Sequence, residues 1–265
     1  MQHSLFDLTG KTAFITGATK GIGRAIAEAF ADHGATFVLT SRNGSEAQAV
    51  AAEINARVGR DAATGMESDL YDLKKSLAAY DAAVAQFGRI DILVCNAAAT
   101  PSLFGGAADF PVEEYASRLQ ANVVNNLAMM NHAAAAMKAR RDGVILATSS
   151  AAGVRTTYGV FPYGVSKGAL SHAVRLLASE LAPYNVRVNA VAPGLTRSWS
   201  VEQAIAHAPE MMDAFTKSIP LGRITEAEEI AAGMVFLASA GGKAITGQTI
   251  VMDGGETGSG APTDV

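Results

Sequence analysis

Cysteines and long apolar runs are almost absent from this sequence. The one cysteine is Cys95, and no stretch of about 18 uninterrupted apolar residues occurs. A single cysteine excludes an internal disulfide and a multi-cysteine metal site, and it fits a reducing compartment. The N-terminus also lacks the basic start and apolar stretch of a secretory signal. We therefore expect a cytoplasmic protein without a membrane span.

Charge is scarce as well. Charged residues make up 17% of the chain, and 21 Lys+Arg against 25 Asp+Glu give a formal net charge of −4. A chain with this balance has no overall attraction for nucleic acid or for an anionic membrane. No acidic or histidine cluster has metal-ligand spacing, so we expect no metal. The hydrophobic content of 49% excludes a disordered chain.

Short β-branched runs alternate with longer segments in which apolar residues recur at helical spacing. The pattern predicts strands at residues 12–16, 36–40, 64–68, 91–95, 143–148, 186–191 and 249–252. Strands that alternate with helices imply right-handed crossovers and a mostly parallel sheet with helices on both faces. We predict one doubly wound α/β domain over residues 1–265; two domains are the less economical alternative. Such a sheet binds ligands at the carboxyl ends of its strands, where the strand order reverses.

A glycine-rich loop follows the first predicted strand, and a helical pattern begins directly after it. Glycines permit positive φ and let a phosphate approach the backbone, and a helix N-terminus attracts the negative charge of a pyrophosphate. An ordinary strand–helix turn is the alternative, but the position in the first βαβ unit favours dinucleotide binding. The candidate binding residues of this loop are Gly17, Thr19, Lys20, Gly21, Ile22 and Gly23.

Tyr163 and Lys167 form the strongest chemical signal. Residues at i and i+4 share one helix face, so the phenol and the ammonium can meet. The phenol has an ordinary pKa near 10, and a neighbouring ammonium is expected to lower that pKa. Tyr163 is then a candidate general acid/base. Alone, the pair could be a surface contact. However, Ser149 and Ser150 follow the predicted strand 143–148, where a hydroxyl can bond to a substrate oxygen as charge develops on it.

The loop spacing Thr-Gly-x-x-x-Gly-x-Gly, together with Tyr163-x-x-x-Lys167, resembles the short-chain dehydrogenase/reductase family. The resemblance extends from about Leu8 to Gly255. It implies a single-domain Rossmann-type fold with a seven-stranded parallel sheet. Ser150 precedes Tyr163 by the family's spacing and is preferred to Ser149.

The resemblance also implies how the chemistry is divided. The catalytic residues are Asn122, Ser150, Tyr163 and Lys167. Tyr163 exchanges a proton with the substrate oxygen while a hydride passes between NADP(H) and a carbonyl or secondary alcohol. Ser150 holds that oxygen, and Lys167 contacts the nicotinamide ribose. Asn122 is expected to bind a water that links the lysine to solvent.

The end of the second predicted strand indicates which nicotinamide cofactor is bound. NAD-binding folds usually place a carboxylate there, on the ribose 2′-hydroxyl. Here Ser41 and Arg42 stand instead, and a guanidinium can bind a 2′-phosphate bidentately. Lys20 adds a second positive charge. Solvated side chains are the alternative, but we predict NADP(H).

Other cofactor contacts are implied by the resemblance alone. Asp69 and Leu70 correspond to adenine-binding positions, although Asp69 could equally be the N-cap of a helix over 73–87. Asn96 and Ala97 correspond to ribose-side positions, and Ala98 replaces a usual glycine. The nicotinamide end is assigned to Pro193, Gly194, and either Thr196 or Ser198.

The remaining expectations concern the periphery of the chain and its assembly. Residues 195–219 are predicted to form a lid over the substrate, or else ordinary packing. Residues 256–265 are predicted to be a flexible tail. The resemblance implies a homotetramer that binds a small-molecule substrate. Two alternatives are a dehydratase or epimerase, and a non-enzymatic NADP-sensing or interaction protein; the intact Tyr163 and Lys167 favour the reductase.

Overall fold

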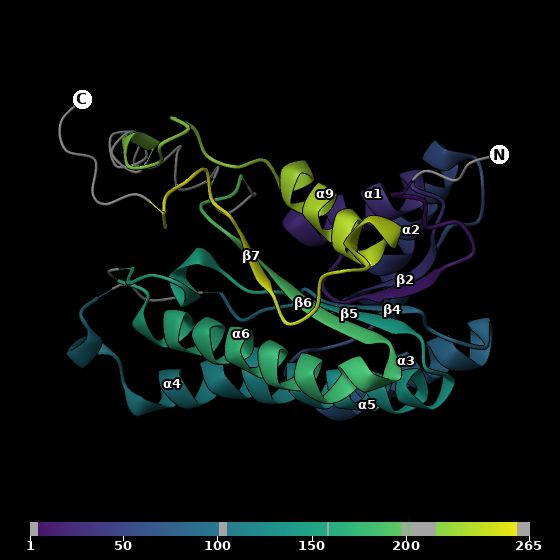
Figure 1. The fold of residues 1–265 in the computed structure, drawn as a ribbon, viewed down its shortest axis with the longest axis horizontal. Helices are drawn as coiled ribbons and strands as arrows, with labels where there is room; N and C mark the ends of the chain where they lie inside the picture. Colours follow the sequence, from purple (N-terminus) through teal and green to yellow (C-terminus); the bar gives the residue numbers. More distant parts are fainter. Residues whose placement is uncertain (1–4, 101–104, 158, 198–200, 202–215, 259–265) are drawn as a thin grey trace.

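The computed structural model describes residues 5–100, 105–157, 159–197, 201 and 216–258 (Figure 1). A single seven-stranded sheet, ordered β3-β2-β1-β4-β5-β6-β7, runs through it, and every neighbouring pair is parallel. The strands are β1 (Thr12–Ile15), β2 (Thr36–Ser41), β3 (Ala63–Glu67), β4 (Ile92–Cys95), β5 (Gly143–Thr148), β6 (Val186–Pro193) and β7 (Thr249–Met252). The predicted doubly wound fold with its seven parallel strands is confirmed.

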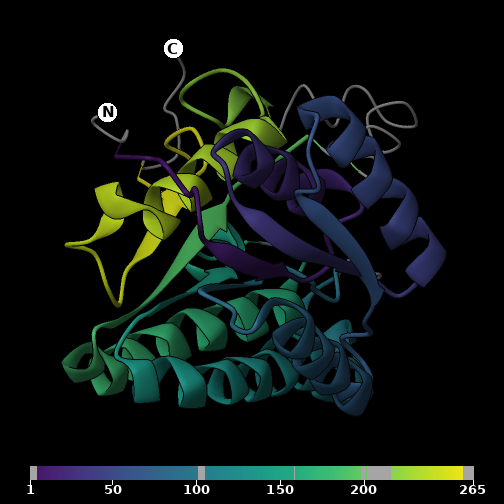
Figure 2. The ribbon, with the colours of Figure 1, turned by 90° about the vertical axis from the view of Figure 1, so that its right-hand side faces the viewer.

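Helices cover both faces of the sheet, as parallel crossovers require. The helices are α1 (Gly21–Asp32), α2 (Gly44–Val58), α3 (Leu73–Phe87), α4 (Val112–Leu119), α5 (Asn126–Arg140), α6 (Phe161–Leu181) and α9 (Ala227–Ala238). Figure 1 shows α1, α2 and α9 on one side and α3 to α6 on the other, and Figure 2 shows the same layers after a quarter turn. A π-helical segment, Gln120–Asn125, joins α4 to α5.

The core consists of two apolar layers separated by the sheet. Ile15 and Leu39 face α1 and α9, whereas their chain neighbours Phe14 and Val38 face α3, α5 and α6. All four side chains are fully buried. Successive strand residues point to opposite faces, so strands covered on both sides need continuous apolar sequences. This requirement explains why short unbroken apolar runs located the strands well.

Strand ends differ from the prediction where pairing decides them. The strand predicted at 186–191 continues to Pro193, because Ala192 and Pro193 pair with Val251 and Met252 of β7. Parallel pairing, rather than side-chain preference, therefore sets this end.

The strand order reverses between β1 and β4, which lie side by side at the centre of the sheet. Ligand sites of open α/β sheets lie outside the carboxyl ends of the strands at such a point. The loops after β1, β4 and β5 therefore carry the candidate site. Within the described residues, no helix has the length and apolarity to cross a membrane.

Candidate active site

The loop after β1 is shaped by its glycines. Gly17 and Gly21 have φ values of +64° and +52°, which favour glycine. A Cβ on Gly17 would lie 2.9 Å from the Cα of Ala97, and one on Gly23 would lie 2.1 Å from the carbonyl oxygen of Gly17. Helix α1 begins at Gly21, and its N-cap, Lys20, makes no capping bond with its side chain. The close backbone and the uncapped helix start suit a pyrophosphate, so the loop fits a dinucleotide.

Asn96 fastens this loop to the ends of two further strands. Its side-chain nitrogen donates to the carbonyls of Thr16 (3.1 Å) and Gly17 (3.0 Å). Its side-chain oxygen accepts from the hydroxyl of Thr148 at 3.0 Å. The backbone N–H groups of Asn96 and Ala97 both donate to the hydroxyl of Thr16, at 3.0 Å each. Asn96 therefore connects the carboxyl ends of β1, β4 and β5.

Tyr163 and Lys167 stand on the first two turns of α6, beside the end of β5. The Nζ atom of Lys167 lies 5.6 Å from the centre of the Tyr163 ring, and it donates to the carbonyl of Thr148 at 2.7 Å. The Ser150 hydroxyl lies near enough to the phenol of Tyr163 to act on its pKa, in the lowering direction. Ser149, the alternative, points elsewhere: its hydroxyl is 2.7 Å from the hydroxyl of Ser171 and donates to the carbonyl of Lys167. The Ser149 hydroxyl is thus engaged with α6, and the preference for Ser150 as the serine that meets substrate stays a prediction.

The electrostatics of this pair differ from the expectation. Burial raises the pKa of Tyr163, and the Ser150 hydroxyl opposes this only in part. Burial also lowers the pKa of Lys167, to about 8. Both shifts favour the neutral forms, because withdrawal from water penalises charge. The predicted lowering of the Tyr163 pKa by the ammonium is therefore wrong for the protein alone.

Asn122 lies in the π-helical segment and is fully buried. Its carboxamide accepts from the N–H of Ala99 (2.7 Å) and donates to the carbonyl of Ala99 (3.1 Å) and the hydroxyl of Ser166 (3.0 Å). Its backbone carbonyl accepts from the side chain of Asn126 at 3.1 Å. Asn122 thus braces the loop after β4 against α6, and its predicted water-binding role stays a prediction.

Ser166 was not predicted from the sequence. Its hydroxyl accepts from Asn122 and donates to the carbonyl of Tyr163 at 2.7 Å. Its place between Tyr163 and Lys167, three residues after the tyrosine, is the signal that could have found it, because residues at i and i+3 are neighbours on a helix.

Two of the residues predicted near the 2′-phosphate, Ser41 and Lys20, contact the carboxylate of Glu46, which the sequence did not predict. Ser41 ends β2, and Arg42 after it is exposed. The hydroxyl of Ser41 donates to one carboxylate oxygen of Glu46 at 2.9 Å, and Lys20 lies 2.8 Å from the other. Sequence reasoning missed Glu46 because it belongs to the next element, α2.

At the adenine end, Asp69 is not the N-cap of α3. That position belongs to Asp72, whose carboxylate accepts from the N–H of Lys75 at 3.1 Å. Asp69 instead accepts from the N–H of Tyr71 at 3.0 Å, and the carbonyl of Leu70 accepts from the side chain of Asn125 at 2.7 Å. The capping alternative is therefore wrong, since the acid three residues later starts the helix.

At the predicted nicotinamide end, Pro193 ends β6, and a Cβ on Gly194 would lie 2.6 Å from the Cβ of Asp253. The hydroxyl of Thr196 donates to the carbonyl of Gly194 at 3.0 Å. Ser198 lies outside the described residues. The chain therefore passes close to the end of β7 here, as a Pro-Gly turn allows.

The predicted lid, residues 195–219, is described only at 195–197, 201 and 216–219. Leu195 and Val201 pack there against Ile219 and Ile224. The rest of the segment lies outside the described residues.

The predicted tail, residues 256–265, begins in contact with the site. Arg155, in the loop after β5, donates to the backbone carbonyl of Glu256 at 2.7 Å and to its carboxylate at 2.8 Å. The N–H of Thr257 donates to Asp253 at 2.6 Å. Glu256 and Thr257 thus make hydrogen bonds to the rest of the fold, residues 259–265 lie outside the described part, and the flexible tail stays a prediction.

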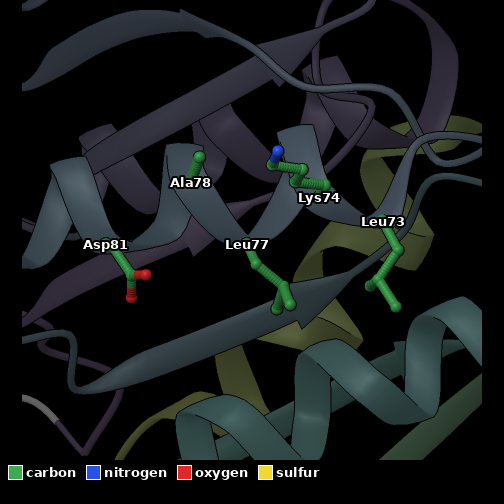
Figure 3. Close-up of a pocket in the computed structure, with 5 residues that line it drawn as sticks. All are labelled: Leu73, Lys74, Leu77, Ala78 and Asp81. Atoms are coloured by element: carbon green, nitrogen blue, oxygen red, sulfur yellow. The ribbon is translucent and has the colours of Figure 1, made fainter.

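A shallow pocket on α3 contains none of the predicted site residues. It is lined by Leu73, Lys74, Leu77, Ala78 and Asp81 (Figure 3), of which Leu73, Leu77 and Asp81 point to one side of the helix. None of its residues belongs to the glycine loop or to the predicted catalytic set. The described residues contain no group of three or more His, Cys, Asp or Glu side chains able to hold a metal.

A glycine cradle at the start of α1, and a Tyr–Lys pair beside it at the switch point of a parallel sheet, define a dinucleotide-binding oxidoreductase. Comparison with known proteins agrees. The family described as enoyl-(acyl carrier protein) reductase matches residues 17–257. Trans-4-hydroxycyclohexanecarboxylate dehydrogenase of Sinomonas cyclohexanicum is 35% identical over 255 residues, which are 93% of each chain. D-threitol dehydrogenase of Mycolicibacterium smegmatis is 34% identical and covers 95% of each chain.

Solved structures give the same result. A short-chain dehydrogenase/reductase from Mycobacterium marinum has a TM-score of 0.86 and 36% identity, and covers 96% of this chain and 98% of its own. A candidate NAD(P)-dependent gluconate 5-dehydrogenase from Beutenbergia cavernae, with NADP bound at low occupancy, has a TM-score of 0.89 and 32% identity, and covers 97% and 100%. The chain belongs to the short-chain dehydrogenase/reductase family, whose members are NAD(P)-dependent oxidoreductases that transfer a hydride.

Proposed function

We propose that this chain transfers a hydride reversibly between NADP(H) and a carbonyl or secondary alcohol of a small molecule, with Tyr163 as general acid/base. The observation that carries the proposal is the group formed by Tyr163, the Ser150 hydroxyl that acts on the pKa of its phenol, and Lys167, whose Nζ atom lies 5.6 Å from the centre of the phenol ring. Lys167 is linked to the glycine loop through Thr148 and Asn96, by three hydrogen bonds in series.

The cofactor supplies the hydride when bound. The chain supplies the proton and holds the oxygen. In the reductive direction, the Tyr163 hydroxyl gives its proton to the substrate oxygen, and the Ser150 hydroxyl donates a hydrogen bond to the same oxygen. A Lys167 pKa of about 8 lies close to neutral pH, so this amine can return a proton to Tyr163 without a large energetic cost. Oxidation of the alcohol runs through the same groups in reverse.

The preference for NADP(H) is supported by the charges after β2. Arg42 is exposed there, Lys20 lies in the facing glycine loop, and no acidic residue ends the strand. Lys20 and Arg42 would hold the 2′-phosphate. The substrate class is supported by the relatives named for dehydrogenases of a hydroxycyclohexane acid and of D-threitol. A panel of ring and polyol ketones and alcohols, assayed with NADP(H) and NAD(H), tests cofactor and substrate together.

The decisive variant is Tyr163→Phe, which removes only the hydroxyl. We expect kcat to fall by about 10³-fold, within the range for a lost general acid/base, while the Kd for NADPH stays within about threefold. Tyr184→Phe is the matched control, because Tyr184 contacts Lys138 with its ring, and it should keep full activity. Retention of more than about a tenth of the wild-type rate in Tyr163→Phe would exclude the role of this phenol.

A further inference from the structure

The carboxylate of Glu46 stands between Lys20, which the proposed function assigns to the 2′-phosphate, and Ser41, the last residue of β2. One oxygen lies 2.8 Å from Nζ of Lys20 in the glycine loop, and the other accepts from the hydroxyl of Ser41 at 2.9 Å. Lys20 belongs to the glycine loop and Ser41 to the end of β2, so a single side chain connects these two parts of the candidate site. Arg42 has no hydrogen bond or ion pair to another described residue through its guanidinium.

Glu46 carries its negative charge at neutral pH. Hydrogen bonds from Lys20 and then from Ser41 lower the pKa of its carboxyl. A phosphate that binds Lys20 and Ser41 would lie next to the negative charge of Glu46. Like charges placed side by side at a binding site weaken affinity, so the carboxylate must turn away or be repelled.

The backbone of Glu46 is held at the start of α2, whereas its carboxylate is tied by side-chain contacts to Lys20 and Ser41. Asn43 caps α2 by accepting from the N–H groups of Ser45 (3.1 Å) and Glu46 (3.2 Å). The Lys20 side chain is 76% exposed, and that of Glu46 is 30% exposed. An ion pair at the surface adds little to the stability of a fold. Exchange of the carboxylate for a phosphate therefore costs the fold little.

We propose that Glu46 is a specificity-determining residue of the cofactor site, one that competes with the 2′-phosphate of NADP(H) for Lys20 and Ser41. The same carboxylate can remain in place beside the 2′-hydroxyl of NAD(H), and it can accept a hydrogen bond from that hydroxyl. Glu46 thus reduces the ratio of NADP(H) affinity to NAD(H) affinity below the value that Lys20 and Arg42 would otherwise give. The inference rests on the proposed function through the use of a nicotinamide cofactor and the assignment of its 2′-phosphate to Lys20.

Glu46→Gln tests the inference by removing the charge and keeping the shape. Dissociation constants of the full chain for NADPH and NADH are measured by fluorescence titration, with 2′,5′-ADP and 5′-AMP as fragments that differ by the phosphate. We expect NADPH and 2′,5′-ADP to bind about tenfold more tightly, a change typical of a relieved like-charge contact, and NADH and 5′-AMP to bind equally or more weakly.

Glu53→Gln is the matched control. Glu53 is also on α2, but it pairs with Arg24 at 2.8 Å, away from Lys20 and Ser41. This variant makes the same change in net charge and should leave the four affinities within about twofold. In a Lys20→Gln background, Glu46→Gln should lose most of its effect.

Three results overturn the inference: an unchanged NADPH affinity in Glu46→Gln, an equal gain for both cofactors, or an equal gain in Glu53→Gln. The proposed function fails separately, if the wild-type chain binds these nucleotides but reduces no carbonyl of the panel. In that case the binding constants still decide the role of Glu46.

Discussion

Replacement of Lys167 by methionine tests how deeply the lysine is buried, independently of catalysis. The lysine is buried in the folded chain, and its pKa falls from 10.5 to about 8. Between these two values, the folded protein has released the proton and the unfolded chain still holds it. Stability increases with pH wherever the unfolded state binds more protons. Lys167 therefore makes the free energy of unfolding increase with pH above about pH 8.

The size of the effect follows from the shift. One pKa unit corresponds to about 1.4 kcal/mol, so the increase between about pH 8 and pH 9.5 is about 2 kcal/mol. Lys167→Met removes this increase. The difference in unfolding free energy between wild type and variant should therefore grow by about 2 kcal/mol across that interval. The variant also loses the bond to the carbonyl of Thr148, a change that does not depend on pH in this interval and so leaves the slope unaffected.

Urea unfolding of both proteins, without cofactor and followed by circular dichroism, measures this difference. Cys95 and Tyr80 also have raised pKa values, of about 12 each, caused mainly by burial. Lys167 lowers the pKa of Cys95, so its loss can only raise that pKa further. Both groups therefore stay protonated in the two folded proteins up to pH 9.5, and their contributions cancel in the comparison. A difference that stays constant within about 0.5 kcal/mol from pH 7 to 9.5 would refute the reasoning about burial.

Two further predictions concern the frame of the site. Gly23→Ala should weaken NADPH binding at least about tenfold in a fluorescence titration and destabilise the fold by about 1–3 kcal/mol, because its Cβ would lie 2.1 Å from the carbonyl oxygen of Gly17; normal affinity would show that the loop can relax. Asn125→Ala should lower the free energy of unfolding by about 1–3 kcal/mol in urea, because it leaves the carbonyl of Leu70 without its 2.7 Å partner; a loss below about 0.5 kcal/mol would mean that water replaces the amide.

The fold was predictable from local patterns because a sheet covered on both faces imposes them. Strand β4 is buried along its whole length, so its sequence has to be a continuous apolar run. The glycine loop was predictable for a similar reason: Gly23 has no room for a side chain, and that constraint is visible in the sequence itself.

Features that depend on how deeply a side chain is buried, or on contacts between residues far apart in the sequence, were not predictable. The spacing of Tyr163 and Lys167 gave their shared helix face, but the direction of the Tyr163 pKa shift depends on burial by other segments. Glu46 meets Lys20 and Ser41 only once three separate elements are assembled. For Asp69 and Asp72, either acid suits a helix start, and only the backbone decides between them.

The bond between Arg155 and Glu256 has a practical consequence for work with this protein. It joins the loop that carries Ser150 to the last described turn of the chain. Truncation before Glu256 would remove both acceptors of that guanidinium. Shortened variants of this protein should therefore keep Glu256, because its loss would release the Arg155 side chain in the loop that carries Ser150.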